Sequence, residues 1–254
     1  MPLPDFTSPT LFPSFLSLPI DTEPPPESSS ETFLLAQILE NMTLTKPTLI
    51  CTDVHPSSPT TNNTNNTPQQ QPISPSNRFA IVFPSRPGSG PDTLDFRRLG
   101  YKKGSTLVIR GARRRVRGGD AGASASTAVS EEELPGSNSQ PGGGSGSGRE
   151  VGFVAVERAD EGLVSVVPTG VGKVRELGVW LRERDEKRLQ QGGGEEGVVF
   201  GCETCGRMEG TLLKKCTGCG EVAYCGKECQ LRGWDEGGHK GDCKAIKAIR
   251  AIWP

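Results

Sequence analysis

Short runs of β-branched and aromatic residues recur through the middle of the chain, and each run is bounded by glycine, proline or aspartate. This pattern is typical of strands in a small sheet. The expected strands are Phe79–Phe83, Thr106–Arg110, Val151–Val156 and Leu163–Val167. Further along, the charged stretch Gly172–Gln191 carries apolar residues at helical spacing, which predicts a helix: Val174, Leu177, Trp180, Leu181 and Leu189. Residues 78–191 are therefore expected to form a small α+β domain.

A glycine- and serine-rich stretch at residues 118–148 interrupts the predicted strands. Such a composition is typical of a flexible linker, so we expect this insert to be disordered. The sheet can still close across it, because the entropy of loop closure rises only slowly with loop length. Gly192–Gly194 marks a second linker, which separates the α+β domain from a C-terminal module at residues 201–254.

Residues 1–77 are rich in proline, serine, threonine, asparagine and glutamine. A segment of this composition buries too little apolar surface to offset its chain entropy, which predicts a long disordered N-terminal arm. One stretch differs, because Glu31–Leu44 has apolar residues at helical spacing and predicts a short helix: Phe33, Leu34, Leu35, Ile38, Leu39 and Met42. This helix could dock on a partner or lie against the chain's own middle domain.

Composition agrees with a chain that is only partly packed, since hydrophobic residues make up 33% and the chain holds 33 glycines and 21 prolines. The segment Met1–Ile20 lacks a basic start, and its repeated prolines break any apolar helix, so it does not resemble a secretion signal. No apolar segment approaches the ~20 residues that a membrane span needs. We therefore expect a nuclear or cytoplasmic protein whose cysteines bind metal rather than form disulfides, with no membrane association.

Seven of the eight cysteines and one of the two histidines fall within residues 202–243. Several are paired by two- or three-residue spacers, which bring two ligands to one metal through a tight turn or along one helix face. The eight side chains match the donors of two structural zinc ions: Cys202, Cys205, Cys216, Cys219, Cys225, Cys229, His239 and Cys243. Spacing alone leaves open whether the two ligand sets are sequential or interleaved. Cys51, outside this window, is expected to remain a reactive thiol.

The residues around these ligands resemble the MYND-type zinc finger: Tyr224 precedes Cys225, Gln230 follows Cys229, and Trp234 is followed by His239, Lys240 and Cys243. The resemblance covers about residues 202–243, and the rest of the chain resembles no family that we can name. It implies a cross-braced finger with interleaved sets: Cys202, Cys205, Cys225 and Cys229 for one zinc ion, and Cys216, Cys219, His239 and Cys243 for the other. One departure is the longer spacer Asp235–Gly238, whose two glycines are expected to loosen or loop the final helix.

The resemblance also implies a binding role for Gln230 and Trp234, which in similar fingers help to line a shallow groove for proline-containing peptides. The residue types suit this role, because a flat indole accepts a preformed polyproline II ligand and an amide can bond its free carbonyls. Trp234 could equally pack over the zinc core.

These features predict a protein–protein interaction adaptor whose zinc finger recruits a proline-containing partner segment, a role suited to transcriptional regulation. Catalysis is not expected, because both four-ligand sets are closed to water and His55 is the one histidine left to act as a base. The alternatives are a RING-like ubiquitin ligase, or an enzyme of unrecognised fold in residues 78–191.

Nucleic acid is not the expected partner of the finger, because its seven thiolates outweigh two zinc ions and cancel its small basic excess. A basic run elsewhere could be a nuclear-localisation or phosphate-contacting patch, or only a solvated loop: Lys102, Lys103, Arg110, Arg113, Arg114, Arg115 and Arg117.

Overall fold

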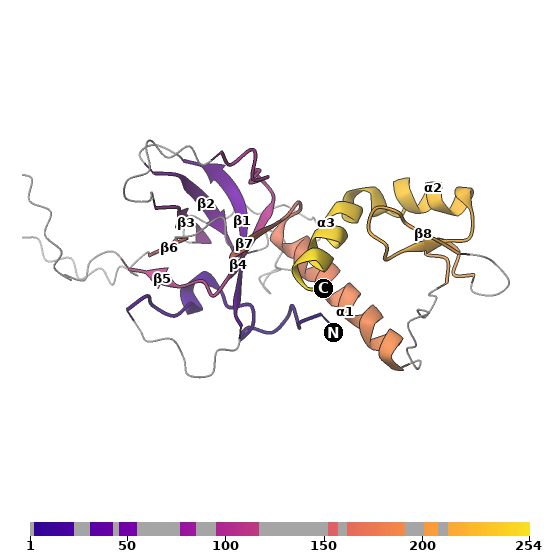
Figure 1. Ribbon diagram of the computed structural model, residues 1–254, viewed down its shortest axis with the longest axis horizontal. Coiled ribbons are helices and arrows are strands. Elements are labelled where there is room, and N and C mark those ends of the chain that lie inside the picture. Colours follow the sequence, from indigo (N-terminus) through magenta and orange to yellow (C-terminus); the bar gives the residue numbers. More distant parts are fainter. Residues whose placement is uncertain are drawn as a thin grey trace, which may run out of the picture.

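A seven-stranded mixed sheet occupies one end of the molecule and two helices connect it to a small finger at the other end (Figure 1). The computed structural model describes residues 3–22, 31–42, 46–54, 77–84, 95–116, 152–156, 162–190, 201–207 and 213–254. The strands of the sheet are β1 (Phe33–Asn41), β2 (Thr48–Thr52), β3 (Phe79–Val82), β4 (Thr106–Arg110), β5 (Arg114–Arg115), β6 (Phe153–Ala155) and β7 (Val164–Val167). Helix α1 (Val171–Gln190) follows the sheet.

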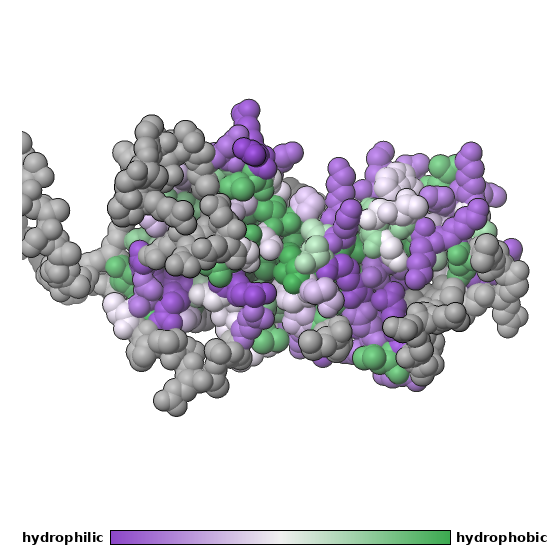
Figure 2. All heavy atoms as spheres, in the orientation of Figure 1, coloured by the Kyte–Doolittle hydropathy of each residue, from purple (hydrophilic) through white to green (hydrophobic). Residues whose placement is uncertain are grey.

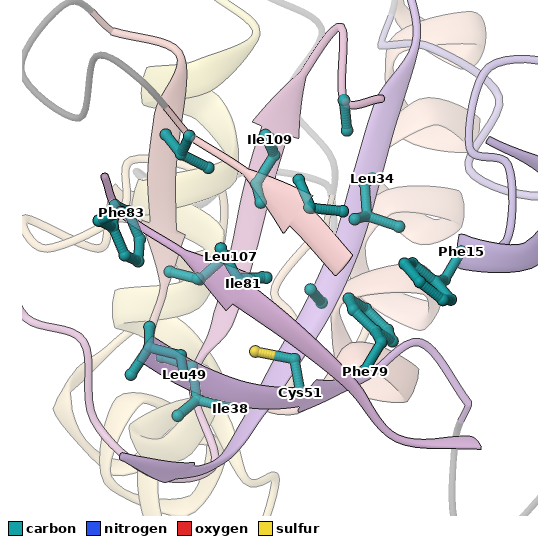
Figure 3. Close-up of a cluster of buried hydrophobic side chains, with 14 of the residues drawn as sticks. Phe15, Leu34, Ile38, Leu49, Cys51, Phe79, Ile81, Phe83, Leu107 and Ile109 are labelled. Atoms are coloured by element: carbon teal, nitrogen blue, oxygen red, sulfur yellow. The ribbon is translucent and has the colours of Figure 1, made fainter. Parts of the chain in front are cut away.

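The sheet is strongly curved and encloses its own core. Its strand order is β5-β6-β3-β2-β1-β4-β7, in which β3 and β6 form the parallel pair. Because β4 and β5 are separated by only a few residues, the two ends of the sheet must lie near each other. Figure 3 shows apolar side chains from these strands pointing into the shared interior, among them Leu49, Ile81 and Leu107. This core makes the sheet a rigid support for the elements outside it.

Four predicted strands and the predicted helix are confirmed, as β3, β4, β6, β7 and α1. The sheet also closes across the interruption, since Arg114 pairs with Val154 on the far side of it. Gly152 makes this pairing possible, because a Cβ there would clash with the carbonyl oxygen of Arg115. The predicted disorder of residues 118–148 lies outside the described residues.

The predicted helix at Glu31–Leu44 is wrong, because this stretch forms the central strand β1 between β2 and β4. Both faces of β1 are covered. Leu34, Ala36 and Ile38 point into the sheet core, while Phe33 and Leu35 pack into a second core beneath α1. A strand buried on both faces is apolar at consecutive positions, and such a run has no periodicity that separates it from a buried helix.

The prediction of a disordered arm over residues 1–77 is wrong for residues 3–22, 31–42 and 46–54. Six residues of the first segment are buried: Leu3, Phe6, Phe12, Pro13, Phe15 and Leu18. The sheet domain therefore begins well before residue 78. Prolines exclude a helix here but suit an extended segment, whose large side chains still bury much apolar surface. The rest of the predicted arm, including residues 23–30 and 55–76, lies outside the part of the chain that the structure describes.

A second core joins the N-terminal segment, the outer face of the sheet, α1 and the C-terminal helix α3 (His239–Ile252). The Phe6 ring stacks on Phe12 at 4.8 Å and meets Trp253 edge-on at 5.1 Å, so the two ends of the chain lie side by side (Figure 1). Gly178 on α1 provides the space for the Phe6 ring. The C-terminal module is thus packed against the sheet domain.

Ion pairs surround this junction. Arg250 on α3 donates hydrogen bonds to Asp185 on α1 at 2.7 and 2.8 Å and to Glu221 of the finger at 2.7 Å. Burial acts to raise the pKa of Asp185, but the hydrogen bonds and charge of Arg250 outweigh it and lower that pKa. Figure 2 shows hydrophilic side chains over much of the half of the molecule that holds α1, α3 and the finger. Within the described residues, no helix is long and apolar enough to cross a bilayer.

We expect Phe6→Ala to lower the free energy of unfolding by about 3–5 kcal/mol, the usual cost of removing a fully buried phenylalanine side chain. Leu16→Ala is the matched control, because Leu16 is 50% exposed and its removal should cost little. Urea unfolding followed by circular dichroism measures both changes. Equal stability of the two variants would show that the N-terminal segment does not belong to the core.

Candidate metal centres in the C-terminal finger

The first group of metal-ligand side chains combines two distant parts of the finger. Cys202 and Cys205 lie on the opening loop, Cys225 follows strand β9 (Ala223–Tyr224), and Cys229 lies on helix α2 (Lys227–Asp235). Their four sulfur atoms are all within 4.8 Å of one another. The Sγ atoms of Cys205 and Cys225 are 3.6 Å apart, and those of Cys225 and Cys229 are 3.5 Å apart.

The second group takes its ligands from the segments between and after those of the first. Cys216 and Cys219 flank a tight turn beyond strand β8 (Lys214–Lys215), and His239 and Cys243 lie one turn apart on α3. The Nε2 atom of His239 is 3.3 Å from Cys216 Sγ and 3.5 Å from Cys219 Sγ. The four ligand atoms again lie within 4.8 Å of one another. The two groups are the ligand sets that the family resemblance implies.

Both groups fit zinc. A tetrahedral ion with Zn–S bonds of about 2.3 Å separates its sulfur ligands by about 3.8 Å, and the observed Sγ separations are 3.5–3.8 Å. Thiolate and imidazole are the donors that structural zinc prefers, and each group supplies four. The finger therefore holds two separate sites for two structural zinc ions.

Thiol ionisation shows why each group needs a cation. At Cys202, burial acts to raise the thiol pKa, but backbone hydrogen bonds lower it to about 6. At Cys229, the hydrogen bond with Cys225 raises the pKa to about 12, and at Cys243 burial does the same. The charge of neighbouring thiolates, Cys202 in the first group and Cys216 and Cys219 in the second, adds to these increases in pKa, so a metal ion is needed to hold all of the thiols ionised.

The glycine-containing spacer before His239 forms a sharp break between two helices. Helix α2 ends at Asp235 and α3 begins at His239, with Gly238 between them in the left-handed region at φ 72°. The expected loop is confirmed. It does not displace His239, which is buried and reaches the second site.

Gln230 and Trp234 lie one turn apart on α2, so they share one side of the helix. Gln230 is exposed, whereas Trp234 is half-buried and its ring meets His239 edge-on at 5.6 Å. Trp234 therefore packs against a metal ligand with part of its surface and leaves the rest accessible.

Cys51 is not the reactive thiol that we expected. It lies on β2, is completely buried in the sheet core, and burial strongly raises its pKa. A protonated, inaccessible thiol is a poor nucleophile. Cys51 is unreactive because its side chain faces the sheet core from β2, and its separation from the zinc ligands in sequence does not make it accessible. His55 lies outside the described residues.

The basic run is largely tied into internal contacts. Arg113 and Arg115 pair with Asp21, and Arg110 pairs with Glu31. Arg114 lies over the Phe15 ring at 6.0 Å. Arg113, Arg114 and Arg115 therefore help to fasten the N-terminal segment to the sheet, a role that the sequence did not indicate.

Two cavities were not foreseen from the sequence. The first, which we call the sheet groove, has a volume of about 590 Å³ on the outer side of β2, β3 and β6, and includes Lys46, Ile50, Arg78, Arg115 and Phe153. The second, which we call the finger cleft, has a volume of about 580 Å³ between α1 and the finger. Its walls come from segments far apart in the sequence, so no local pattern could have indicated it.

Comparison with known proteins identifies the finger alone. Residues 202–243 match the family described as MYND finger, so this chain carries a zinc-binding module of the protein-interaction type. No curated protein matches the chain. Among solved structures it is similar to Schizosaccharomyces pombe Pot1pC bound to single-stranded DNA, with 13% identity and a TM-score of 0.28, over 61% of this chain and 88% of that one.

We expect elemental analysis to find two zinc ions per chain after zinc-supplemented expression. A thiol reagent should react with none of the cysteines in the zinc-loaded protein, and with the seven finger cysteines once a chelator is added. Cys51 should react only when denaturant opens the sheet core. Cys51→Val is the control, because it should abolish this last reaction and leave the seven unchanged. One zinc ion per chain, or a reactive Cys51 in the native state, would contradict this assignment.

Proposed function

We propose that this protein is a non-enzymatic adaptor of the nucleus or cytoplasm, whose MYND finger recruits a partner through a proline-containing segment. The observation that carries the proposal is the placement of Gln230 and Trp234. They share one side of α2, and part of the indole remains accessible although the ring edge is fixed against His239. A regulatory complex, such as one that controls transcription, would suit such an adaptor.

The arrangement of this pair suits a polyproline II ligand. Such a segment is already extended and loses little entropy on binding, and its carbonyl groups are free to accept hydrogen bonds. Trp234 offers a flat apolar surface whose orientation His239 restricts, so little side-chain entropy remains to be lost. The exposed amide of Gln230 can donate to a peptide carbonyl.

Two features support an adaptor over an enzyme. Each zinc site has four protein donors, so neither offers the open position that catalytic zinc needs. The one histidine among the described residues, His239, is itself a ligand. The ubiquitin ligase remains the alternative, and an autoubiquitination assay with purified ubiquitin-pathway enzymes tests it.

Trp234→Ala should weaken binding to an array of proline-containing peptides by about 30-fold or more, because an aromatic anchor at a hot spot contributes about 2 kcal/mol. Gln230→Ala should weaken the same peptides less, since a single neutral hydrogen bond contributes about 1 kcal/mol. Both variants should retain two zinc ions, because neither side chain is a ligand.

Glu228→Ala is the matched control, since Glu228 is exposed on the opposite side of α2. Zinc loss from Trp234→Ala would show that the indole serves mainly to pack the finger. If Trp234→Ala retains both zinc ions and binds the peptides as tightly as the unmodified protein, the α2 surface is not the site that binds proline-containing peptides.

A specific observation favours a second candidate function, the binding of single-stranded nucleic acid in the sheet groove. The described residues that line this groove include Lys46, Arg78 and Arg115 and no carboxylate. Its floor includes Ile50, Val82 and the partly exposed ring of Phe153. Cations beside an aromatic platform are what a phosphate backbone and stacked bases require. The charge argument against nucleic acid applies to the finger, which lies elsewhere.

For this second function, a fluorescent oligothymidylate should bind the full chain with an affinity that falls steeply as salt rises. The double variant Lys46→Gln, Arg78→Gln should reduce the salt slope by about two contacts, and Phe153→Ala should cost about 1–3 kcal/mol through lost stacking. Arg115 is left intact because its ion pair with Asp21, at 2.6 Å, holds the N-terminal segment, whereas Arg78 makes a longer pair of 3.4 Å with the exposed Glu40. Lys227→Gln on the finger is the control. Absent or salt-independent binding would exclude this function.

A further inference from the structure

A smaller cavity, which we call the arginine pocket, lies beside the sheet groove. Its charged lining residues are Arg110, Arg113, Arg115 and Asp21. The pocket has a volume of about 210 Å³, which is several times the volume that one water molecule occupies in the liquid. Arg115 and Ala155 line both cavities, so the pocket adjoins the groove. A ligand that lies in the sheet groove is therefore within reach of the pocket.

Two guanidinium groups converge on one carboxylate in the arginine pocket. Asp21 accepts a hydrogen bond from Arg115 Nε at 2.6 Å, and its other carboxylate oxygen lies 3.7 Å from Arg113 Nε. A guanidinium binds carboxylate and phosphate through the same planar set of donors. The position between Arg113 and Arg115 is therefore suited to an anion, and in this structure the chain's own Asp21 fills it.

This position is accessible from solvent. The side chains of Asp21 and Arg115 are 37% and 38% exposed, and that of Arg113 is 23% exposed. Water screens an ion pair of this exposure, so exchanging its anion for another has a small cost. A phosphodiester group has one negative charge, as the carboxylate does. Replacing the carboxylate with a phosphate therefore leaves the charge balance at the two arginines unchanged.

The Asp21 carboxylate can be displaced while the N-terminal segment stays on the sheet. The backbone N–H of Asp21 donates to the carbonyl of Arg114 at 3.0 Å, and that of Arg114 donates to the carbonyl of Pro19 at 2.9 Å. The Phe15 ring stacks on Phe79 at 4.3 Å and is buried in the sheet core. These contacts hold the backbone, so a rotation of one side chain is enough to vacate the position.

Positive charge extends from the arginine pocket along the sheet groove. Five cations line the two cavities: Lys46, Arg78, Arg110, Arg113 and Arg115. Among the described lining residues, Asp21 is the one carboxylate. Arg78 and Arg110 also pair with Glu40 and Glu31, which are half-exposed and lie outside both linings. Positive charge exceeds negative even with these two glutamates included, which favours a ligand with several phosphate groups.

We propose that Asp21 occupies the position of a phosphate group and thereby limits how tightly the sheet groove binds a single strand. When a strand lies over Phe153, one of its phosphates displaces the carboxylate from Arg113 and Arg115. This inference rests on the second proposed function, because it takes a nucleic acid strand as the ligand of the groove. It adds a regulatory contact, in which a carboxylate of the N-terminal segment keeps the affinity of the groove low.

Removing the charge of Asp21 tests this role. Asp21→Asn keeps the backbone contacts, and its amide oxygen can still accept a hydrogen bond from Arg115. The variant should bind a fluorescent oligothymidylate about two- to fivefold more tightly than the unaltered zinc-loaded chain, with a salt slope that is steeper by about one contact. Glu183→Gln is the matched control, because it makes the same change in charge at an exposed residue of α1 and should alter neither value.

A double-variant comparison shows whether the gain arises at the two arginines. In a chain that already carries Arg113→Gln, the further change Asp21→Asn should strengthen oligothymidylate binding less than it does in the unaltered chain. The reason is that the carboxylate and the phosphate compete for the same pair of guanidinium groups. An equal gain in both chains would show that Asp21 acts only as a distant charge, which would overturn the proposal.

Pyrophosphate is the second probe, and it separates this inference from the function on which it rests. Added to the full chain labelled with nitrogen-15, it should shift the Nε signals of Arg113 and Arg115 at lower concentration in Asp21→Asn than in the unaltered chain. Absence of this difference would overturn the anion position even if oligothymidylate binds. Oligothymidylate binding that Asp21→Asn leaves unchanged would overturn the regulatory role and leave the function of the groove intact. Shifted arginine signals without oligothymidylate binding to either chain would exclude the second function, and with it a strand as the ligand of this pocket.

Discussion

Helix α3 is the element on which both halves of the molecule depend, because it serves the metal at one end and the hydrophobic core along the rest. His239 and Cys243 are ligands of the second zinc site, and Ala245, Ile246 and Ile249 are buried in the core shared with α1 and the sheet. Structural zinc in finger peptides contributes about 10–16 kcal/mol of apparent binding energy, which becomes folding energy. Here zinc binding also fixes the start of α3, whose buried side chains complete the second core against the sheet.

The contacts around α3 determine its direction as well as its position. Arg250 joins α1 to the finger through Asp185 and Glu221, and Trp253 joins the end of α3 to the rings of Phe6 and Phe33. Partly buried ion pairs add little net stability, but they cost much when one partner is lost, so they favour one arrangement over alternatives. The finger cleft depends on this arrangement, since both α1 and α3 contribute residues to its lining.

The sequence predicted what depends on local pattern. Short β-branched and aromatic runs located β3, β4, β6 and β7. Ligand spacing located the eight zinc donors, and the family resemblance divided them into two sets. It failed where burial on both sides removes periodicity, as in β1, and where a few aromatic residues in a proline-rich segment outweigh average composition, as with Phe6 and Phe12. The reactivity of Cys51 and the finger cleft could not be predicted, because both depend on which distant segments meet in space. Tyr224 was visible as part of a motif, but the burial of its hydroxyl without a partner among the described residues was not.

The pairing of β5 with β6 has a consequence for how this chain can change. Arg115 and Phe153 face each other in the sheet, so the two ends of the intervening residues are held about one strand spacing apart. Lengthening or shortening what lies between them alters the closure entropy only slightly. The junction is therefore a natural insertion point, at which evolution could add or remove sequence, or an investigator could place a reporter domain, without disturbing the strands on either side.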